Sequence, residues 1–225
     1  MELRAEKISR DFLRYSAKDG YFTAVAETDF TLAAGTLTAV TGRSGSGKST
    51  LLHILGGLMK PVTGRVLLDE TDIYALSEAE RDALRRRHIG IAPQRLMSLA
   101  ALTVRENILL PTLLTGQEGA AAARADALME RLGIRKLASV TPSELSGGEL
   151  RRVTIARALV MQPGILLADE PTGDLDEENT QNVLRLLRET ADAGTAVLLV
   201  THEREAAAYA DAAYTMTAGK LDKIA

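Results

Sequence analysis

Residues 42–50 read GRSGSGKST and follow the apolar run LTAVT at 37–41. Residues without a Cβ take backbone conformations closed to others, so the glycines let the chain wrap tightly, with its N–H groups pointing inward as an anion site. The apolar run from Leu51 onward has helical spacing, so the loop opens a helix whose N-terminus also favours negative charge. This stretch therefore predicts a loop that binds a polyphosphate between a strand and a helix.

The polar residues of the loop have separate expected tasks. Lys48 is expected to reach the β- and γ-phosphates of a nucleotide, and the Ser49 hydroxyl to bind Mg²⁺, as in other loops with this spacing. A glycine-rich turn with only a structural role is the alternative, which the lysine and serine in register after a strand-like run disfavour. The residues expected to contact the nucleotide are Gly42, Arg43, Ser44, Gly45, Ser46, Gly47, Lys48, Ser49 and Thr50.

The composition bounds the class of protein. A chain of 225 residues is long enough for one α/β domain with a sizeable core, with or without an inserted lobe. Its 27 basic and 30 acidic residues leave a net charge of −3, so no nucleic-acid partner is expected. The lack of cysteine excludes disulfides and thiolate metal sites. Because no run of about 18 apolar residues occurs, we expect any membrane-spanning part to belong to another subunit.

Three short apolar runs predict strands buried on both faces, which is typical of parallel sheets. These runs are residues 37–41, 165–168 and 196–201. Each run is followed directly by residues that can bind a ligand or take part in catalysis: the glycine-rich loop, the pair Asp169 and Glu170, and His202. Ligands of open α/β sheets bind beyond the carboxyl ends of the strands, so we expect these segments to meet at one edge. The predicted fold class is α/β with a mostly parallel sheet.

Helix signals fill the gaps between these strands. Ser77 and Glu80 form a capping-box pair ahead of one helix, and residues 119–133 form another. Asp176 caps a third helix, which has an apolar face. That face comprises Val183, Leu184, Leu186 and Leu187. Residues 95–160 have a helical pattern without strand alternation, so we expect a helical lobe inserted into the sheet domain.

Two adjacent acids end the second predicted strand, in the sequence ILLADE at 165–170. Hydrolysis of a nucleotide needs a carboxylate near Mg²⁺ and a base near the attacking water. Asp169 is expected to hold the metal, directly or through water, and Glu170 to orient and polarise the water that attacks the γ-phosphate. A solvated acidic turn is the alternative, which the preceding buried run disfavours because it ties both acids to the sheet edge of the phosphate loop.

A second stretch, LSGGE at 145–149, predicts another anion site. Ser146 and Glu149 form a capping box for the helix that follows, and Gly147 and Gly148 leave backbone N–H groups open. A helix start of this kind attracts phosphate. Because the chain already has one phosphate loop, a second donor site suggests that it binds the ATP of another protomer. A capped helix without a ligand is the alternative.

With these motifs in order, the chain resembles the ATP-binding cassette (ABC) ATPases over essentially its whole length. LSGGE at 145–149 is similar to the family's signature sequence. Further matches are Gln94 in IAPQ, similar to the family's Q-loop, GDLD at 173–176, similar to its D-loop, and His202, similar to its switch histidine. The resemblance implies a P-loop NTPase fold that binds and hydrolyses ATP with Mg²⁺. It also implies that Gln94 contacts Mg²⁺ and water and relays the nucleotide state to a membrane partner, and that His202 holds the γ-phosphate.

The resemblance also implies the organisation of the chain. Residues 1–225 would form one ABC ATPase domain, in which 1–94 and 161–225 make a RecA-like core with an N-terminal β-subdomain and 95–160 make the helical lobe. Two cassettes would sandwich two nucleotides head to tail, as an expected homodimer, with a heterodimer left open. They would lie in the cytoplasm, on the inner face of the cell membrane, against a separate permease subunit.

Two residues depart from the family pattern. Glu149 stands where glutamine is usual, which adds negative charge near a site for phosphate, and Pro93 precedes Gln94 where an aromatic residue is common, which stiffens that segment. Adenine is usually held by an aromatic residue near the N-terminus of such chains. Phe12 is the expected stacking residue, with Tyr15 as the second candidate and a core role as the alternative.

Within the family, PSELSGG at 142–148 and EPTG at 170–173 are most similar to the subgroup that serves lipoprotein release, macrolide or peptide export, and a related cell-division ATPase. We therefore expect an ATPase subunit that powers a permease in the export or extraction of a peptide, lipoprotein or antibiotic. A regulatory cassette that transmits force to a wall enzyme or sensor without transport is the alternative. A soluble cassette of DNA repair or translation is a third possibility, disfavoured because Asp169 follows Gly42 too closely for a long coiled coil and because the chain holds a single cassette.

Overall fold

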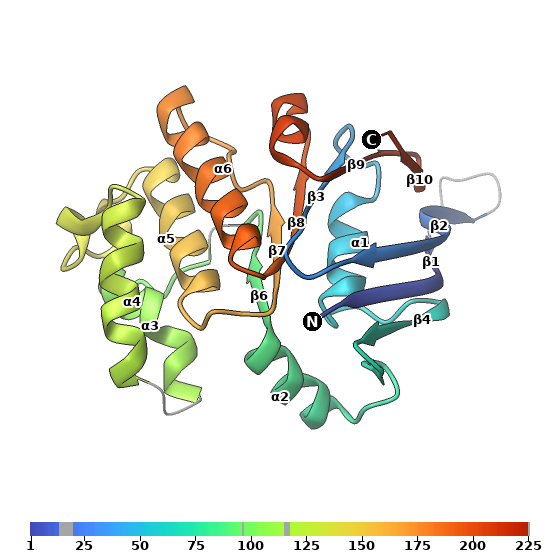
Figure 1. Cartoon of the computed structure of the whole chain (residues 1–225), viewed down its shortest axis with the longest axis horizontal. Helices are drawn as coiled ribbons and strands as arrows, with labels where there is room; N and C mark the ends of the chain where they lie inside the picture. The colour runs from blue at the N-terminus through green and yellow to red at the C-terminus, as the bar shows by residue number, and fades with distance from the viewer. Residues whose placement is uncertain (14–19, 96, 115–117, 225) are drawn as a thin grey trace.

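The computed structural model describes residues 1–13, 20–95, 97–114 and 118–224, which form two sheets with helices packed around them (Figure 1). The larger sheet has the strand order β10-β9-β3-β8-β7-β6. The strands from β9 to β6 run parallel, and β10 runs antiparallel to β9. The strands of this sheet are β3 (Leu37–Thr41), β6 (Ile89–Ala92), β7 (Ile165–Asp169), β8 (Ala196–Thr201), β9 (Ala212–Thr217) and β10 (Lys220–Lys223).

The larger sheet confirms the predicted α/β class, and its three central strands, β3, β8 and β7, are the predicted ones. β7 is one residue longer than expected because Asp169 continues the pairing opposite Val200 of β8. The parallel register brings the carboxyl ends together, with Thr41 of β3 beside Thr201 of β8. The loop after β3, the acids at the end of β7 and His202 therefore meet at one edge, as predicted.

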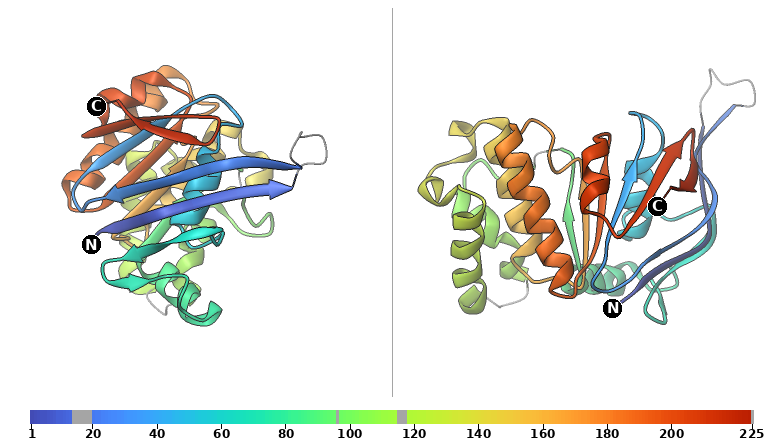
Figure 2. Two further views of the ribbon diagram at one scale, coloured as in Figure 1. Left: turned by 90° about the vertical axis from the view of Figure 1, so that its right-hand side faces the viewer. Right: turned by 45° about the horizontal axis from the view of Figure 1, so that its top comes forward.

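Helices cover both faces of this sheet, and Figure 2 shows the helical segment on one side and the smaller sheet on the other. The capping box between Ser77 and Glu80 is formed, and the Asp176 side chain accepts from the backbone N–H of Asn179. These helices and the one predicted over 119–133 are confirmed. The helices are α1 (Lys48–Leu55), α2 (Glu78–His88), α3 (Val104–Leu109), α4 (Glu118–Arg131), α5 (Gly147–Leu159) and α6 (Glu177–Asp192), with the 3-10 helices η1 (Leu110–Leu114), η2 (Arg135–Leu137), η3 (Pro142–Glu144) and η4 (Arg204–Tyr209).

The central strands serve two separate cores. Along β8, Val197 and Leu199 belong to a core shared with α3, α4, α5 and α6, whereas Leu198 and Val200 belong to one shared with α1 and the smaller sheet. Successive side chains of a strand point to opposite faces, so a strand buried on both faces needs apolar residues at every position. This explains the uninterrupted apolar runs in the sequence.

The smaller sheet is antiparallel, in the order β2-β1-β4-β5, and packs over α1. Its strands are β1 (Leu3–Leu13), β2 (Tyr21–Leu32), β4 (Thr63–Leu68) and β5 (Thr71–Asp72).

Between residues 97 and 160, the described residues form helices and no strand. The exact division of the chain into core and inserted lobe stays a prediction. Among the described residues, no helix combines the length and the apolar character that crossing a membrane requires.

The packing of β8 can be tested by truncating one core side chain. Leu198 is fully buried, so we expect Leu198→Ala to lower the free energy of unfolding by about 2–5 kcal/mol through lost contacts and a cavity. Leu13→Ala on β1 is the control, because Leu13 is 69% exposed and its truncation should cost less than about 0.5 kcal/mol. Urea unfolding followed by circular dichroism measures both, and equal losses would contradict the fold.

Candidate functional site

The phosphate loop joins β3 to α1 and wraps where side chains have no room. Gly47 takes a φ of 110°, and a Cβ there would overlap the carbonyl of Ala24. A Cβ on Gly42 would likewise overlap the carbonyl of Met216. Both glycines are therefore required by the close approach of neighbouring strands. Gly45, also at positive φ, has open space around it.

Lys48 is the first residue of α1 and is almost completely buried, with an exposed fraction of 6%. Its Nζ donates to the backbone carbonyls of Gly42, at 2.6 Å, and Arg43, at 3.2 Å, and lies 3.8 Å from Oε1 of Glu170. Within the described part of the chain, the buried hydroxyl of Ser46 has no hydrogen-bond partner. The loop thus holds an ammonium group and an unsatisfied hydroxyl that a phosphate could engage.

Asp169 is buried at the end of β7, and its Oδ1 has no hydrogen-bond partner among the described residues. Burial raises the pKa of this carboxyl above its usual value, while a hydrogen bond with Ser49 opposes the rise. Mg²⁺ is commonly held by one or two protein oxygens together with substrate phosphates and water. The carboxylate of Asp169 and the Ser49 hydroxyl fit that pattern. No cluster of three or more metal-binding side chains occurs in the described ranges, so phosphate oxygens would have to complete the set.

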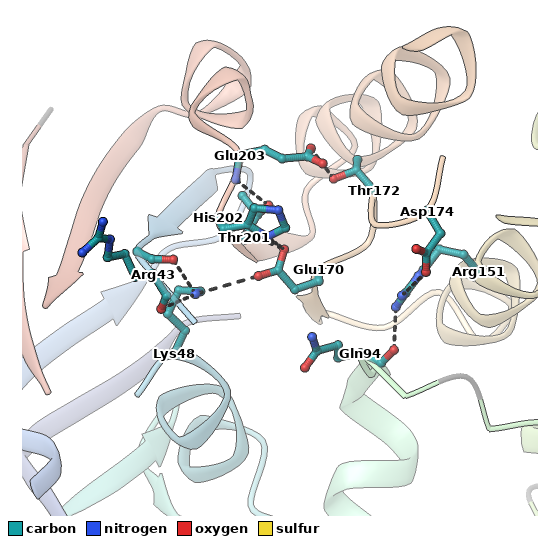
Figure 3. A network of polar contacts seen from close by, with 11 residues as sticks. Arg43, Lys48, Gln94, Arg151, Glu170, Thr172, Asp174, Thr201, His202 and Glu203 are labelled. Atoms are coloured by element: carbon teal, nitrogen blue, oxygen red, sulfur yellow. Dashed lines mark hydrogen bonds and ion pairs between the residues drawn. The ribbon is translucent and has the colours of Figure 1, made fainter. Parts of the chain in front are cut away.

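Glu170 follows β7 in a left-handed conformation, with a φ of 49°, which is uncommon for residues with a side chain. Its carboxylate is held from two sides. Oε1 lies 3.8 Å from Nζ of Lys48. Oε2 lies 2.9 Å from Nδ1 of His202 and also accepts a hydrogen bond from the backbone N–H of His202 at 3.3 Å. Figure 3 shows Glu170 between these two side chains. The His202 side chain is 64% exposed, so it borders solvent while Glu170 is buried.

A cavity of about 360 Å³ collects most of the predicted residues. It is lined by Phe12, Phe22, Ala24, Ser44, Gly45, Ser46, Gly47, Lys48, Ser49, Thr50, Gln94, Glu170 and His202. Gly42 and Arg43 line an adjoining cavity of about 580 Å³, which shares five lining residues with the first: Phe22, Ser44, Gly45, Ser46 and His202. The structure thus brings both loop ends, Gln94, Glu170 and His202 together, and leaves Asp169 buried beside them.

Phe12 lines the same cavity near the C-terminal end of β1, with the guanidinium carbon of Arg10 5.0 Å from its ring centroid. Tyr15, the second candidate, lies outside the described residues. Phe22 is a lining residue that the sequence analysis does not single out. It pairs with Phe12 across β1 and β2, so correct register of these two strands would have identified it.

The signature residues lie elsewhere. The capping box is formed: Ser146 Oγ accepts from the backbone N–H of Glu149, at 3.3 Å, and the Glu149 carboxylate accepts from the Ser146 N–H and hydroxyl, at 2.8 Å each. These hydrogen bonds hold the pKa of Glu149 below its usual value. Ser146, Gly147, Gly148 and Glu149 line a separate depression of about 420 Å³, together with Arg152, Asp174, Leu175, Asp176 and Asn179. This depression shares no lining residue with the cavity of the phosphate loop.

Further polar contacts that the sequence analysis misses tie the loops together. Thr172 donates to Glu203 at 2.6 Å, and the Glu203 N–H donates to the Thr201 hydroxyl at 3.1 Å, which joins the segments after β7 and β8. Arg151 of α5 donates to the backbone carbonyl of Gln94 at 2.7 Å (Figure 3). No periodicity or motif marks such contacts between distant segments.

Comparison with known proteins gives one family. A protein-family model described as ABC transporter matches residues 25–173. The lipoprotein-releasing system ATP-binding protein LolD of Psychrobacter arcticus is 46% identical over 186 residues, which cover 81% of this chain and 82% of the relative. LolD of Shewanella sp. (strain MR-4) is 41% identical over 227 residues, which cover 99% and 96%.

Solved structures agree with the sequence relatives. The dimeric, post-hydrolysis structure of the ATP-binding cassette MJ0796 bound to ADP and Pi superposes with a TM-score of 0.90 at 29% identity, and covers 99% of both chains. A second dimeric structure of MJ0796, described as a bacterial ABC transporter cassette, gives a TM-score of 0.89.

The buried carboxyl of Asp169 predicts a pH-dependent stability. Because its pKa is raised in the fold, the folded chain holds this proton more tightly than the unfolded chain does, and the ionised form destabilises the fold. This destabilisation is absent below the pKa of Asp169 in the unfolded chain, about 4. It grows as the pH rises and is complete above the pKa of Asp169 in the folded chain. We therefore expect Asp169→Asn, without nucleotide or Mg²⁺, to be more stable than the parent at pH 7, with a gain that shrinks toward pH 4.

Urea unfolding at a series of pH values measures this gain. Glu130→Gln, which changes an exposed acid on α4, is the control and should show no such trend. A less stable Asp169→Asn chain at neutral pH would contradict the assigned burial cost.

Proposed function

From the premise that this chain belongs to the ABC transporter family and is an ATPase of the P-loop fold, we propose that it powers the release of lipoproteins from a membrane. The family match and the superposition on solved cassettes confirm the resemblance identified from the sequence, at the level of family and fold. The observation that carries the proposal is the similarity to LolD, which extends over 99% of this chain in the Shewanella relative. It favours transport over the regulatory alternative.

The phosphate loop would bind the triphosphate of ATP. The N–H groups at the start of α1 and the ammonium of Lys48 offer positive charge at one point, and Lys48 can exchange its two backbone carbonyl acceptors for phosphate oxygens. We assign the adenine to the part of the cavity beside Phe12, because the aromatic ring supplies a stacking surface. Residues Gly42 to Thr50 keep the contact roles expected from the sequence.

Asp169, Ser49 and Gln94 are the proposed holders of Mg²⁺. The orphaned Oδ1 of Asp169 and the neighbouring Ser49 hydroxyl support this assignment, and Gln94 lines the cavity next to them. When bound, Mg²⁺ would neutralise charge on the β- and γ-phosphates. It would also remove the cost of burying the carboxylate of Asp169, because a cation stabilises the ionised form.

Glu170 is the proposed general base. Its carboxylate is fixed by Lys48 and His202, so it can orient a water toward the γ-phosphate and accept its proton. His202 would contact the γ-phosphate through the ring nitrogen that does not face Glu170. The hydrogen bond at Nδ1 sets the orientation of the ring and so of that second nitrogen.

A dimer would complete the site. Cassettes of this family act with membrane permeases and dimerise, and MJ0796 is dimeric in its complex with ADP and Pi. The separation of the signature depression from the phosphate cavity supports a head-to-tail homodimer in which Ser146, Gly147 and Gly148 cover the partner's ATP. We further propose that the dimer works on the inner face of the cell membrane, against a permease subunit, without a nucleic-acid partner.

A shared site makes turnover depend on protein concentration. We expect ATPase activity per chain to rise as dilute protein is concentrated. We expect the Glu170→Gln chain to bind ATP and to accumulate as a dimer, with turnover lowered by roughly 10²–10⁴-fold. Phosphate release and sedimentation with ATP measure these effects, with Glu130→Gln as the unaffected control. Constant specific activity at all dilutions would contradict the shared site, and near-normal turnover in Glu170→Gln would remove Glu170 from the base role.

The cargo can be tested with the membrane complex. The tagged chain is purified with its membrane subunit, and the complex is placed in lipid vesicles that carry an acylated lipoprotein. We expect ATP to drive transfer of the lipoprotein to a soluble acceptor, and the complex with Glu170→Gln to transfer none. A complex that hydrolyses ATP and leaves every lipoprotein in the membrane would support the regulatory alternative.

A further inference from the structure

Arg151 carries a buried positive charge close to both phosphate-binding regions. It lies in the second turn of α5, and its exposed fraction is 5%. A buried guanidinium is stable only where nearby groups compensate the loss of water. Its position is therefore set by the few groups that it touches.

The contacts of Arg151 are unequal. Its Nη1 donates to the backbone carbonyl of Gln94 at 2.7 Å, a short charge-assisted hydrogen bond. Its Nη2 lies 3.8 Å from Oδ2 of Asp174, whose side chain is 73% exposed. Its buried Nε has no hydrogen-bond partner in the part of the chain that the structure describes. The guanidinium thus holds Gln94 firmly and Asp174 loosely, and its charge balance depends on an acid that solvent or a docking chain can reach.

The two partners of Arg151 belong to different regions. Gln94 lines the cavity of the phosphate loop, whereas Asp174 lines the separate depression of the signature. Asp174 takes a left-handed φ of 65°, and its carbonyl lies so close to Gly148 that a Cβ there would stand only 3.1 Å away. The segment that ends in Asp174 begins at Glu170, whose carbonyl accepts from the Gly173 N–H at 3.2 Å. Figure 3 shows Arg151 between Gln94 and Asp174.

We propose that Arg151 is a positioning residue that couples the two nucleotide sites of the dimer, by linking the Gln94 segment at one site to Asp174 at the other. This inference rests on the proposed shared site. A nucleotide or a partner chain that docks beside the signature displaces or pairs the exposed carboxylate of Asp174. The guanidinium is a rigid fork, so a change at Nη2 shifts the hydrogen bond that Nη1 makes with Gln94. Occupancy of one site thereby alters the geometry at the other, and by linkage the effect is reciprocal.

Three variants separate coupling from mere stability. Arg151→Gln removes the charge, Asp174→Asn removes the ion pair but leaves the bond to Gln94, and the double variant combines them. Arg188→Gln is the matched control, because Arg188 is half-buried and makes ion pairs with Asp192, at 2.8 Å, and Asp211, at 2.6 Å.

The readouts are the Hill slope of ATPase activity against ATP and the ATP concentration that half-dimerises the Glu170→Gln chain. We expect Arg151→Gln to move the Hill slope toward 1 and to raise the midpoint of dimerisation roughly three- to tenfold. Asp174→Asn should act in the same direction, and the double variant should be no worse than Arg151→Gln alone. Arg188→Gln should lower the melting temperature without changing either readout.

The outcomes distinguish this inference from the shared site. If the unaltered chain shows neither a Hill slope above 1 nor concentration-dependent turnover, the shared site is wrong and the coupling falls with it. If the unaltered chain is cooperative and Arg151→Gln changes only the melting temperature, Arg151 is structural and the shared site stands. Additive effects of Arg151→Gln and Asp174→Asn would also overturn the coupling.

Discussion

The buried carboxylate of Glu170, held between Lys48 and His202, is the interaction on which the rest of the site depends. It requires three segments far apart in the chain to end at the same edge of one sheet, and the parallel pairing of β3, β8 and β7 supplies that constraint. Because Glu170 is buried, its charge is stable only when Lys48 and His202 are in place beside it. Asp169 is also buried, and its Oδ1 has no hydrogen-bond partner among the described residues. A bound cation would therefore stabilise the ionised carboxylate.

The sequence predicts those parts of the structure that one segment encodes alone. The apolar runs of β3, β7 and β8, the glycines at 42 and 47, and the capping boxes of α2 and α5 are all local signals, and all are confirmed. β6 and β9 are not predicted, because Gly90 interrupts the apolar run of β6 and because β9 is only partly buried. Phe22 and Arg151 are missed for another reason: their roles arise from register and from tertiary contacts that no periodicity records.

The signature illustrates how one charge can serve two demands. Glu149 is more acidic than usual because the Ser146 N–H and hydroxyl both bond its carboxylate, so its charge is used to close the capping box. Arg152 lines the same depression and offsets part of that charge toward a phosphate. The departure from glutamine at this position is therefore compatible with an anion site at the start of α5. We propose that the depression binds a triphosphate together with the phosphate loop of a second chain.

We propose that ATP is bound by the loop of one chain and covered by the signature of another. The structure of the Glu170→Gln chain with ATP and Mg²⁺ tests it most directly. We expect two copies, in which Ser146 and the N–H groups of Gly147 and Gly148 in one lie within hydrogen-bonding distance of the γ-phosphate held by the other. A nucleotide bound by a single copy, with residues 145–149 open to solvent, would contradict it.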